Sequence, residues 1–397
     1  MRVLDLRSRH DLFAELARVG ADRECWPVFA AKREVLAVRI DGLSTAAANI
    51  LKQVALTAGG DCAVHRSVAS GRVRRSDAVL FVTPRQLQGV LARLKTQPEC
   101  VSRLAPELKQ VRDRYARTAL PVRLGGRTVD LARRTFVMGV LNVTPDSFSD
   151  GGRYLDASAA VERAEAMQEE GADIIDVGAE STRPGSRPVA PREQLDRLLP
   201  VLKGLKRRLT APVSIDTTSA RVAQAALDEG AQIVNDVSAF RFDAGMAGTV
   251  ARARVPCVVM HMRGKPRTMQ RNPAYKDLMA EVVTFLAETL AHGEKAGIKR
   301  SQMIVDPGIG FGKRREHNLE ILRRLRELRS LGAPILVAPS RKRFIGETLG
   351  LEVGERLEGT LASCVVAAGN GANILRVHDV RAVVRALRLA DAIAGRN

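Results

Sequence analysis

Short apolar runs alternate with amphipathic segments from residue 136 to the end of the chain. Eight such runs contain or end in polar residues, and they occupy 136–142, 173–178, 212–216, 232–236, 257–261, 303–308, 334–340 and 373–379. The segments between them carry apolar residues at helical spacing, and several end at a glycine, where a helix C-cap is expected. Eight strand–helix repeats predict a (β/α)8 TIM barrel, and the count of eight disfavours the alternative of a doubly wound sheet.

The segment 120–131, LPVRLGGRTVDL, precedes the first barrel strand. Its apolar residues alternate on both sides of Gly125 and Gly126, which is typical of a β-hairpin with a two-residue turn. We expect this hairpin to plug the bottom of the barrel.

The first 112 residues have a different pattern. Strands are expected at 3–6, 34–41 and 77–83, and helices at 11–20, 45–59 and 84–95. A chain of 397 residues exceeds the usual size of one hydrophobic core. We therefore predict a small N-terminal α/β or α+β domain over 1–112, without an assignable function, and a barrel domain over 113–397, joined by a helix near 106–117.

Polar side chains stand at the carboxyl ends of the eight predicted barrel strands. In chain order they are Asn142, Asp176, Asp216, Asn235, His261, Asp306, Ser340, and Arg376 with His378. These strand ends open on one face of a barrel, where active sites lie. One such residue alone is explained by a helix cap or a loop contact, but eight that converge indicate a binding site.

Two chemistries are expected on this face. The carboxylates of Asp216 and Asp306 only accept hydrogen bonds, whereas the amide of Asn235 both donates and accepts, so together they suit a flat heterocycle with N–H groups along one edge. Lys342 follows the seventh strand, and Arg376 and His378 end the eighth, which is where barrels bind phosphate.

Asn142 ends the first barrel strand and is followed by a polar, glycine-rich segment, VTPDSFSDGG (143–152). Its neutral oxygen could hold Mg2+ together with waters and substrate oxygens, or could instead bond the loop that follows. The loop is a candidate lid.

The formal net charge is +19, which raises the alternative of a nucleic-acid-binding protein. Basic and acidic residues are interspersed along helical faces, as at 323–329, so we expect a solvated surface and no nucleic-acid partner, with a field that attracts small anions.

The five cysteines stand alone in the sequence, without paired or metal-ligand spacing. They indicate reduced thiols of a cytoplasmic protein and neither a disulfide frame nor a zinc site. No run of eighteen apolar residues occurs, so we expect no membrane span.

Eight motifs resemble, in order, those of the dihydropteroate synthase family. They are VLNVTPDSFSDGG (140–152), DVGAESTRPGS (176–186), SIDT (214–217), IVNDVS (233–238), MHMRGKPRTMQ (260–270), VDPGIGFGK (305–313), SRKRFIG (340–346) and RVHDV (376–380). The resemblance covers about 120–397 and leaves 1–112 aside. One departure is Ala338-Pro339, where the family has Gly-x before Ser-Arg-Lys.

The resemblance implies a cytoplasmic, homodimeric transferase of folate biosynthesis that is a target of sulfonamides. Such an enzyme condenses 6-hydroxymethyl-7,8-dihydropterin pyrophosphate with p-aminobenzoate to give 7,8-dihydropteroate and pyrophosphate.

The resemblance also implies roles for single residues. By motif, Asn142 holds the Mg2+–pyrophosphate, the pterin pocket is formed by Asp216, Asn235, Asp306 and Lys342, and the pyrophosphate is bound by Arg376 and His378. The p-aminobenzoate site is shaped by Thr182, Arg183, Pro184, Phe148, Phe311 and Ser340. Catalysis falls to Lys342, Arg376 and His378, with Asp146 and Phe148 on the lid.

Three rival interpretations stay open at this point. A methyltetrahydrofolate-dependent methyltransferase shares the barrel and the pterin carboxylates but does not need the cations of SRK and RVHD. A synthase acting on a modified pterin of archaea fits the same motifs. Alternatively, the N-terminal domain is the working part, as a partner-binding or regulatory module.

Overall fold

The computed structural model describes residues 2, 4, 6, 9–143, 153–180, 189–264, 268–270 and 272–396, with the side chains of 153–156 left out. The chain divides into two compact units, Met1–Asp113 and Arg114–Asn397. Each unit has a hydrophobic core of its own and is described by itself.

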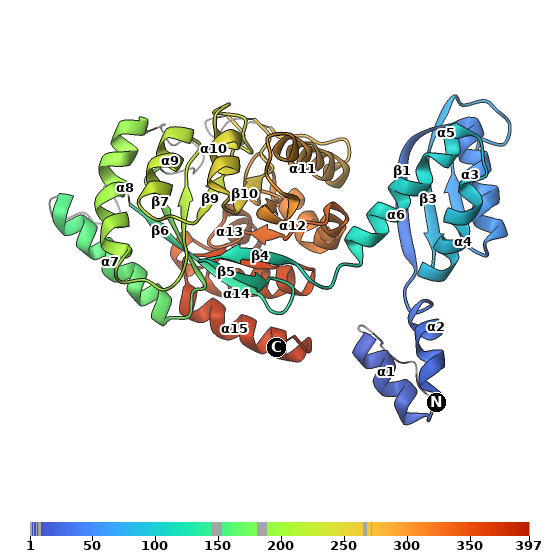
Figure 1. Ribbon diagram of the computed structural model, residues 1–397, viewed down its shortest axis with the longest axis horizontal. Coiled ribbons are helices and arrows are strands. Elements are labelled where there is room, and N and C mark those ends of the chain that lie inside the picture. The colour runs from blue at the N-terminus through green and yellow to red at the C-terminus, as the bar shows by residue number, and fades with distance from the viewer. Residues whose placement is uncertain are drawn as a thin grey trace. The chain divides into compact units, whose positions relative to one another are not determined.

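The N-terminal unit is built on a three-stranded antiparallel sheet with the order β1-β3-β2 (Figure 1). Its elements are α1 (Arg9–Arg18), η1 (Arg23–Cys25), α2 (Trp26–Ala30), β1 (Leu36–Ser44), α3 (Thr45–Thr57), β2 (Asp61–Val64), β3 (Arg75–Val82), α4 (Pro84–Leu94), α5 (Glu99–Ser102) and α6 (Leu104–Tyr115). Alternate side chains of β3 are buried against the helices, so the strand pattern at 77–83 is confirmed.

Two details of this unit differ from the sequence prediction. Leu4 and Leu6, the described residues of the predicted strand at 3–6, lie outside any strand. The sheet is completed instead by β2, whose four residues Asp61–Val64 give too short an alternation to stand out in the sequence.

The second unit is a parallel barrel of eight strands in the order β11-β10-β9-β8-β7-β6-β13-β12. The strands are β6 (Phe136–Asn142), β7 (Ile174–Gly178), β8 (Val213–Asp216), β9 (Ile233–Asp236), β10 (Cys257–Met260), β11 (Met303–Asp306), β12 (Leu336–Val337) and β13 (Ile374–Val377). A parallel bridge between Val305 and Ile335 joins β11 to the segment that leads into β12 and closes the ring. The predicted (β/α)8 barrel is therefore confirmed.

Helices form the outer ring of the barrel (Figure 1). They are α7 (Arg153–Glu169), α8 (Pro191–Leu205), α9 (Ala220–Asp228), α10 (Met246–Ala253), α11 (Leu278–Lys295), α12 (Arg315–Arg324), α13 (Arg343–Leu349), α14 (Leu357–Gly369) and α15 (Val380–Ile393), with 3-10 turns at η3 (Arg300–Gln302), η4 (Leu325–Leu331) and η5 (Val353–Glu355).

Side chains alternate along each barrel strand between the helix ring and the barrel interior. On β7, Ile175 and Val177 pack in the core shared with the helices, whereas Ile174 lies in the interior cluster. Asp176 has the same parity as Ile174, two residues further toward the carboxyl end. Seven strands contribute an apolar residue to this interior cluster, whereas β8 has the buried Ser214 at that position.

The hairpin of β4 (Pro121–Leu124) and β5 (Arg127–Asp130) closes the amino-terminal end of the barrel. Val122, Leu124 and the fully buried Leu131 belong to the same apolar cluster as the lower interior residues of the strands. The predicted plug is confirmed at the amino-terminal end of the barrel.

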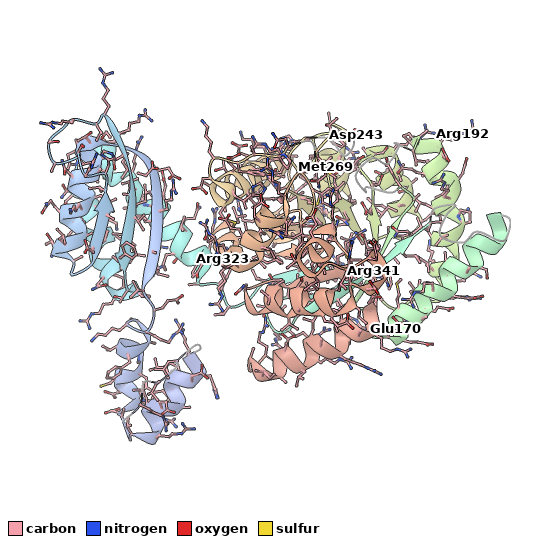
Figure 2. All side chains as sticks on the ribbon, turned by 180° about the vertical axis from the view of Figure 1, so that it is seen from behind. Glu170, Arg192, Asp243, Met269, Arg323 and Arg341 are labelled. Atoms are coloured by element: carbon pink, nitrogen blue, oxygen red, sulfur yellow. The ribbon has the colours of Figure 1, made fainter. Side chains whose placement is uncertain are left out.

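Charged side chains cover the outer surface of the barrel on many elements. Figure 2 labels Arg192 on α8 and Arg323 on α12, which are far apart in the ring. Within the described part of the chain, no helix is both long and apolar enough to cross a membrane.

Candidate active site

A ring of polar side chains lies above the apolar interior layer. Asp176, Asp216, Asn235 and Asp306 end or nearly end four strands, and each is at most 7% exposed. The parallel register places Asp216 beside Asn235, whereas Asp176 is paired with Ser214 and lies two residues closer to the apolar layer. The sequence prediction of a polar rim is thus reproduced in space.

Arg376 from β13 reaches across this ring and joins two carboxylates. Its Nε donates to Oδ2 of Asp176 at 2.6 Å, and its Nη2 donates to Oδ2 of Asp216 at 2.7 Å. Asn235 Nδ2 donates to the same oxygen of Asp176 at 3.0 Å. Four strands are therefore linked by one charged, hydrogen-bonded cluster with two negative groups and one positive group.

Asp176 has an oxygen that this cluster does not use. Within the described ranges, neither its Oδ1 nor the Oγ of Ser214 has a hydrogen-bond partner, and both residues are fully buried. The two residues are register partners on β7 and β8. Because an unpaired buried acceptor is costly, this pair indicates where a bound water or a ligand N–H fits.

Asp306 ends β11 and accepts a hydrogen bond from the backbone N–H of Gly308 at 2.7 Å. Burial raises the pKa of its carboxyl group to about 6, against the opposing effects of that hydrogen bond and of the charges on Lys342, Lys313 and Arg376. Burial also raises the pKa of Asp216, although the guanidinium of Arg376 opposes that shift.

An apolar wall stands beside the polar ring. Its members are buried and come from the end of β10 and from the loops after β9, β10 and β11. They are Val237, Met260, Met262, Met269 and Phe311. The ammonium Nζ of Lys342 lies 4.4 Å from the ring centroid of Phe311, within the range of a cation–π contact. A flat apolar surface and a cation thus adjoin the carboxylates.

His378 follows β13 and contacts Ser340, which follows β12. The Nδ1 of His378 is 3.1 Å from Ser340 Oγ, and the same oxygen accepts the backbone N–H of His378 at 3.2 Å. Burial lowers the pKa of His378 to about 4, helped by the charge on Arg376. In the ligand-free protein this shift favours the neutral imidazole near pH 7, and the role of His378 at the pyrophosphate stays a prediction.

One arrangement of protons satisfies both hydrogen bonds of Ser340. Its Oγ accepts the backbone N–H of His378 and gives its own proton to Nδ1 of the ring. In this tautomer Nε2 carries the ring proton and is the donor of the side chain.

A buried amide anchors the strand–helix connection after β7. Gln194 on α8 donates to Glu180 Oε2 at 3.1 Å and to the carbonyl of Val189 at 2.9 Å, and it accepts from Thr217 at 3.1 Å. Glu180 and Val189 flank residues 181–188. This network ties both sides of that segment to the residue that follows Asp216.

The structure brings together most of the predicted rim. Asp216 contacts Arg376, Phe311 contacts Lys342, and Ser340 contacts His378. Asn235 is linked to Arg376 through Asp176. Asn142 is half-buried at the end of β6. The predicted residues Asp146, Phe148, Thr182, Arg183 and Pro184 lie outside the described residues, so their roles stay predictions.

Sequence reasoning gave no role to three features of this site. Asp176 was recognised as a strand end only, although its alternation with Ile174 already placed it inside the barrel. The methionines of MHM and TMQ form the apolar wall. Lys313, the last residue of VDPGIGFGK, is 2% exposed and lies next to the site.

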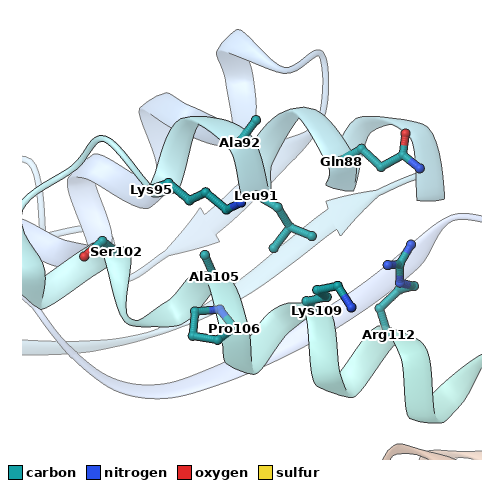
Figure 3. Close-up of a pocket in the computed structure, with 9 residues that line it drawn as sticks. All are labelled: Gln88, Leu91, Ala92, Lys95, Ser102, Ala105, Pro106, Lys109 and Arg112. Carbon is teal, nitrogen blue, oxygen red and sulfur yellow. The ribbon is translucent and has the colours of Figure 1, made fainter.

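A separate groove of about 570 Å3 lies in the N-terminal unit, between α4 and the α5–α6 segment (Figure 3). Leu91 and Ala105 form its apolar floor, and Lys95, Lys109 and Arg112 line its edges. Lys109 and Arg112 both pair with Asp113. No acidic side chain lines this groove, which distinguishes it from the carboxylate ring of the barrel.

Comparison with known proteins places the barrel among enzymes that bind pterins. The family model described as pterin binding enzyme matches residues 138–378. Dihydropteroate synthase of Synechocystis is 44% identical over 288 residues, which are 72% of this chain and 99% of that protein.

Two further relatives extend this picture. The solved structure of Xanthomonas albilineans dihydropteroate synthase with 4-aminobenzoic acid matches with a TM-score of 0.66 and 44% identity, covering 70% of this chain and 99% of that one. The "Probable bifunctional folylpolyglutamate synthase/dihydropteroate synthase" of Haloferax volcanii is 41% identical over 352 residues, 86% of this chain and 41% of that protein. That match is longer than the barrel unit and therefore includes part of Met1–Asp113.

We predict that Asp306→Asn stabilises the ligand-free protein in a pH-dependent way. Below about pH 4 the carboxyl is protonated in both states, so the gain is small. Between pH 4 and 6 the unfolded carboxyl ionises while the folded one does not, and above pH 6 the gain levels off at about 3 kcal/mol. Urea unfolding at several pH values measures this, with the exposed Asp228→Asn as control. A gain that is the same at every pH contradicts the prediction.

Proposed function

This chain belongs to the pterin-binding enzyme family, and from that membership we propose how its barrel carries out the dihydropteroate synthase reaction. That reaction joins 6-hydroxymethyl-7,8-dihydropterin pyrophosphate to p-aminobenzoate and releases 7,8-dihydropteroate and pyrophosphate, as a transferase step of folate biosynthesis. One observation carries the residue assignments: a buried set of carboxylates and an amide adjoins a cation at the same end of the barrel.

The pterin is recognised by its hydrogen-bonding edge and its flat face. Asp306 and Asp216 accept from the ring N–H and amino groups, while Asn235 can both donate and accept. The wall of methionines and Phe311 packs on the ring. A heterocycle without those donors would leave two buried carboxylates unpaired, so the site selects strongly against it.

Arg376 supports this recognition by holding two carboxylates in place. Two of its three nitrogens are engaged by Asp176 and Asp216. This geometry favours a role in orienting the pterin pocket. The assignment of Arg376 to the pyrophosphate, which the family motif implies, remains a proposal for the remaining guanidinium nitrogen.

Lys342 and His378 are the groups suited to the departing pyrophosphate. The C–O bond of the pterin methylene breaks first, and its electron pair leaves on the pyrophosphate oxygen, where an ammonium and a neutral N–H donor lower the energy of the developing charge. The amine of p-aminobenzoate then forms the C–N bond and gives up a proton to solvent. An aniline nitrogen needs no strong base for this attack.

We propose Mg2+ as the cofactor, held from the protein side by the amide oxygen of Asn142. Among the described residues, no group of three or more His, Cys, Asp or Glu is placed to bind a metal. A site of one neutral ligand suits Mg2+, which often keeps waters and phosphate oxygens as its other ligands. When bound, the ion would offset the charge of the pyrophosphate.

We propose that two copies of the chain associate through α14 and α15. From Leu361 onward helix α14 is apolar except for Ser363, although only the face with Cys364 and Ala367 is buried in the barrel. Its outer face exposes Val366 at 48%, and the neighbouring α15 exposes Leu389 at 65% and Ile393 at 79%. A helix that is apolar all round is normally buried, so a second copy is the occupant that makes this face consistent.

The cysteines support a cytoplasmic location, which we also propose. All five are free thiols, and three of them are buried in the cores of the two units. Reduced cysteines are typical of proteins in that compartment.

Pyrophosphate release tests the function. The purified full chain, given dihydropterin pyrophosphate and Mg2+, should release pyrophosphate and form dihydropteroate only when p-aminobenzoate is present. Lys342→Met should lower turnover about 100-fold because an ammonium next to the leaving group is lost. Arg343→Met, an exposed neighbour paired with Glu347, should change little. Release without p-aminobenzoate, or equal losses in both variants, would show that the assignment is wrong.

The Mg2+ proposal predicts a specific change in the metal requirement. Asn142→Ala should raise the Mg2+ concentration for half-maximal turnover by about tenfold or more, because the protein ligand is lost. Asn49→Ala in the N-terminal unit, whose amide bonds Val68, serves as control. An unchanged Mg2+ titration in Asn142→Ala would remove this residue from the metal site.

The dimer proposal predicts that Val366→Asp gives a monomer. A carboxylate in the centre of an apolar interface is desolvated without a partner, which costs more than such an interface can offset. Light scattering after gel filtration measures the mass at fixed concentration. Leu56→Asp, which changes a side chain exposed to 46% in the other unit, should leave the mass unaltered. A wild-type monomer, or a dimeric Val366→Asp, refutes the interface.

A further inference from the structure

A buried lysine that the mechanism above does not use lies beneath the pterin pocket. Lys313 is 2% exposed, and its Nζ lies 2.9 Å from Nδ1 of His261, 3.0 Å from the carbonyl of Phe311 and 3.3 Å from the carbonyl of His261. An ammonium has three N–H donors and no acceptor, so these three acceptors use all of them. The hydrogen bonds therefore favour the charged form of the side chain.

His261 complements this charge as a neutral acceptor. Burial lowers the pKa of its imidazole to about 2, and the charge on Lys313 adds to that effect. The ring packs edge-on against Phe285, at 4.7 Å between centroids. Nδ1 must then be the unprotonated nitrogen, which fixes the tautomer from the hydrogen bond to Lys313.

Lys313 also joins two loops that are pressed together. Gly308 has φ +70°, and a Cβ at this residue would lie 2.0 Å from the carbonyl oxygen of His261. At Gly312 a Cβ would lie 2.4 Å from the carbonyl oxygen of Arg263. The loop after β11 therefore rests directly on the loop after β10, and the ammonium bonds the backbone of both.

The loop that Lys313 fixes carries parts of the site. Phe311, whose carbonyl it binds, places its ring under the ammonium of Lys342. Asp306 ends β11 directly before this loop, and the charges of Lys342, Lys313 and Arg376 lower the pKa of its carboxyl group against the effect of burial. Other bonds hold the rest of the loop, since Gln270 bonds Gly310 and Tyr275 bonds Gly312.

We propose that Lys313 is a positioning residue for the reaction, which fixes the loop bearing Phe311 and supplies a buried positive charge to Asp306 from below the pterin pocket. This proposal rests on the proposed function in one respect, because its kinetic test measures the turnover of that reaction. Lys313 touches neither substrate in this role. It acts through Asp306, whose carboxylate accepts the pterin N–H groups more strongly than its protonated form does.

The charges around Lys313 and Asp306 determine how pterin binding should depend on pH. Burial lowers the pKa of Lys313 to about 7, while Asp306 opposes that shift and Lys342 adds to it. At about pH 6, where Asp306 titrates, the lysine is therefore largely charged. Without this charge the carboxyl of Asp306 keeps its proton to higher pH, so pterin binding should be lost at the acid end of the profile.

Lys313→Met should move the acid limb of kcat/KM for dihydropterin pyrophosphate upward by about one pH unit. This is about a fivefold loss near pH 6, which approaches about tenfold at lower pH and shrinks toward pH 8. The loss should appear mainly in KM. Lys313→Arg, which keeps the charge, should retain the limb of the wild type. Lys203→Met on the outer face of α8 is the matched control and should behave as wild type.

Pterin binding followed by fluorescence across pH gives the same test without turnover. An upward shift of the binding transition in Lys313→Met supports the proposal even if the wild type releases no pyrophosphate, which would refute the proposed function instead. If Lys313→Met does not fold, NMR of the wild type labelled with 15N-lysine replaces it. A slowly exchanging ammonium signal at pH 6.5 that is absent in Lys313→Arg supports the proposal. A pH profile identical to the wild type in folded Lys313→Met, or no protonated Lys313 signal, overturns it.

Discussion

The ion cluster of Arg376 with Asp176 and Asp216 is the constraint around which the mouth of the barrel is organised. These side chains come from β13, β7 and β8, and the guanidinium is within 2.7 Å of both carboxylates. Replacing such a buried cluster by apolar groups is often neutral for stability. Removing one member alone is destabilising, because it leaves a buried charge without a partner. Its value therefore lies in geometry, because a fixed guanidinium holds two acceptors at a set separation and leaves the pocket with one negative charge in excess.

Most of the fold could be predicted from the sequence, because strands buried on both faces appear as continuous apolar runs. All eight runs contain a strand, and the hairpin forms where the glycine pair suggests it. The run 334–340 shrinks to Leu336–Val337, since Pro334 and Pro339 have no N–H to donate to a ladder. The short β2 gave no comparable pattern, and the described part of 3–6 has no partner strand.

The sequence predicted which residues belong to the site, but it predicted the contacts between them only in part. Asn235 and Asp236 are adjacent, and only the barrel decides that Asn235 faces inward while Asp236 holds the backbone of Ser238 and Phe240. Arg376 meets partners that are 200 and 160 residues away, which depends on strand order and register. The neutral state of His378 depends on burial, which spacing does not report. The roles of residues in 144–152 and 181–188 stay predictions.

The sealed lower end of the barrel has a consequence for the traffic of substrates. Val122, Leu124 and Leu131 fill that end, so we expect substrates and products to exchange at the face where the strands end. A pterin bound as proposed, against Asp306 and Asn235, would be covered by whatever enters afterwards. Such a chamber, closed at one end, would impose an order of exchange, in which the pterin enters first and dihydropteroate departs only after the outer position has been vacated.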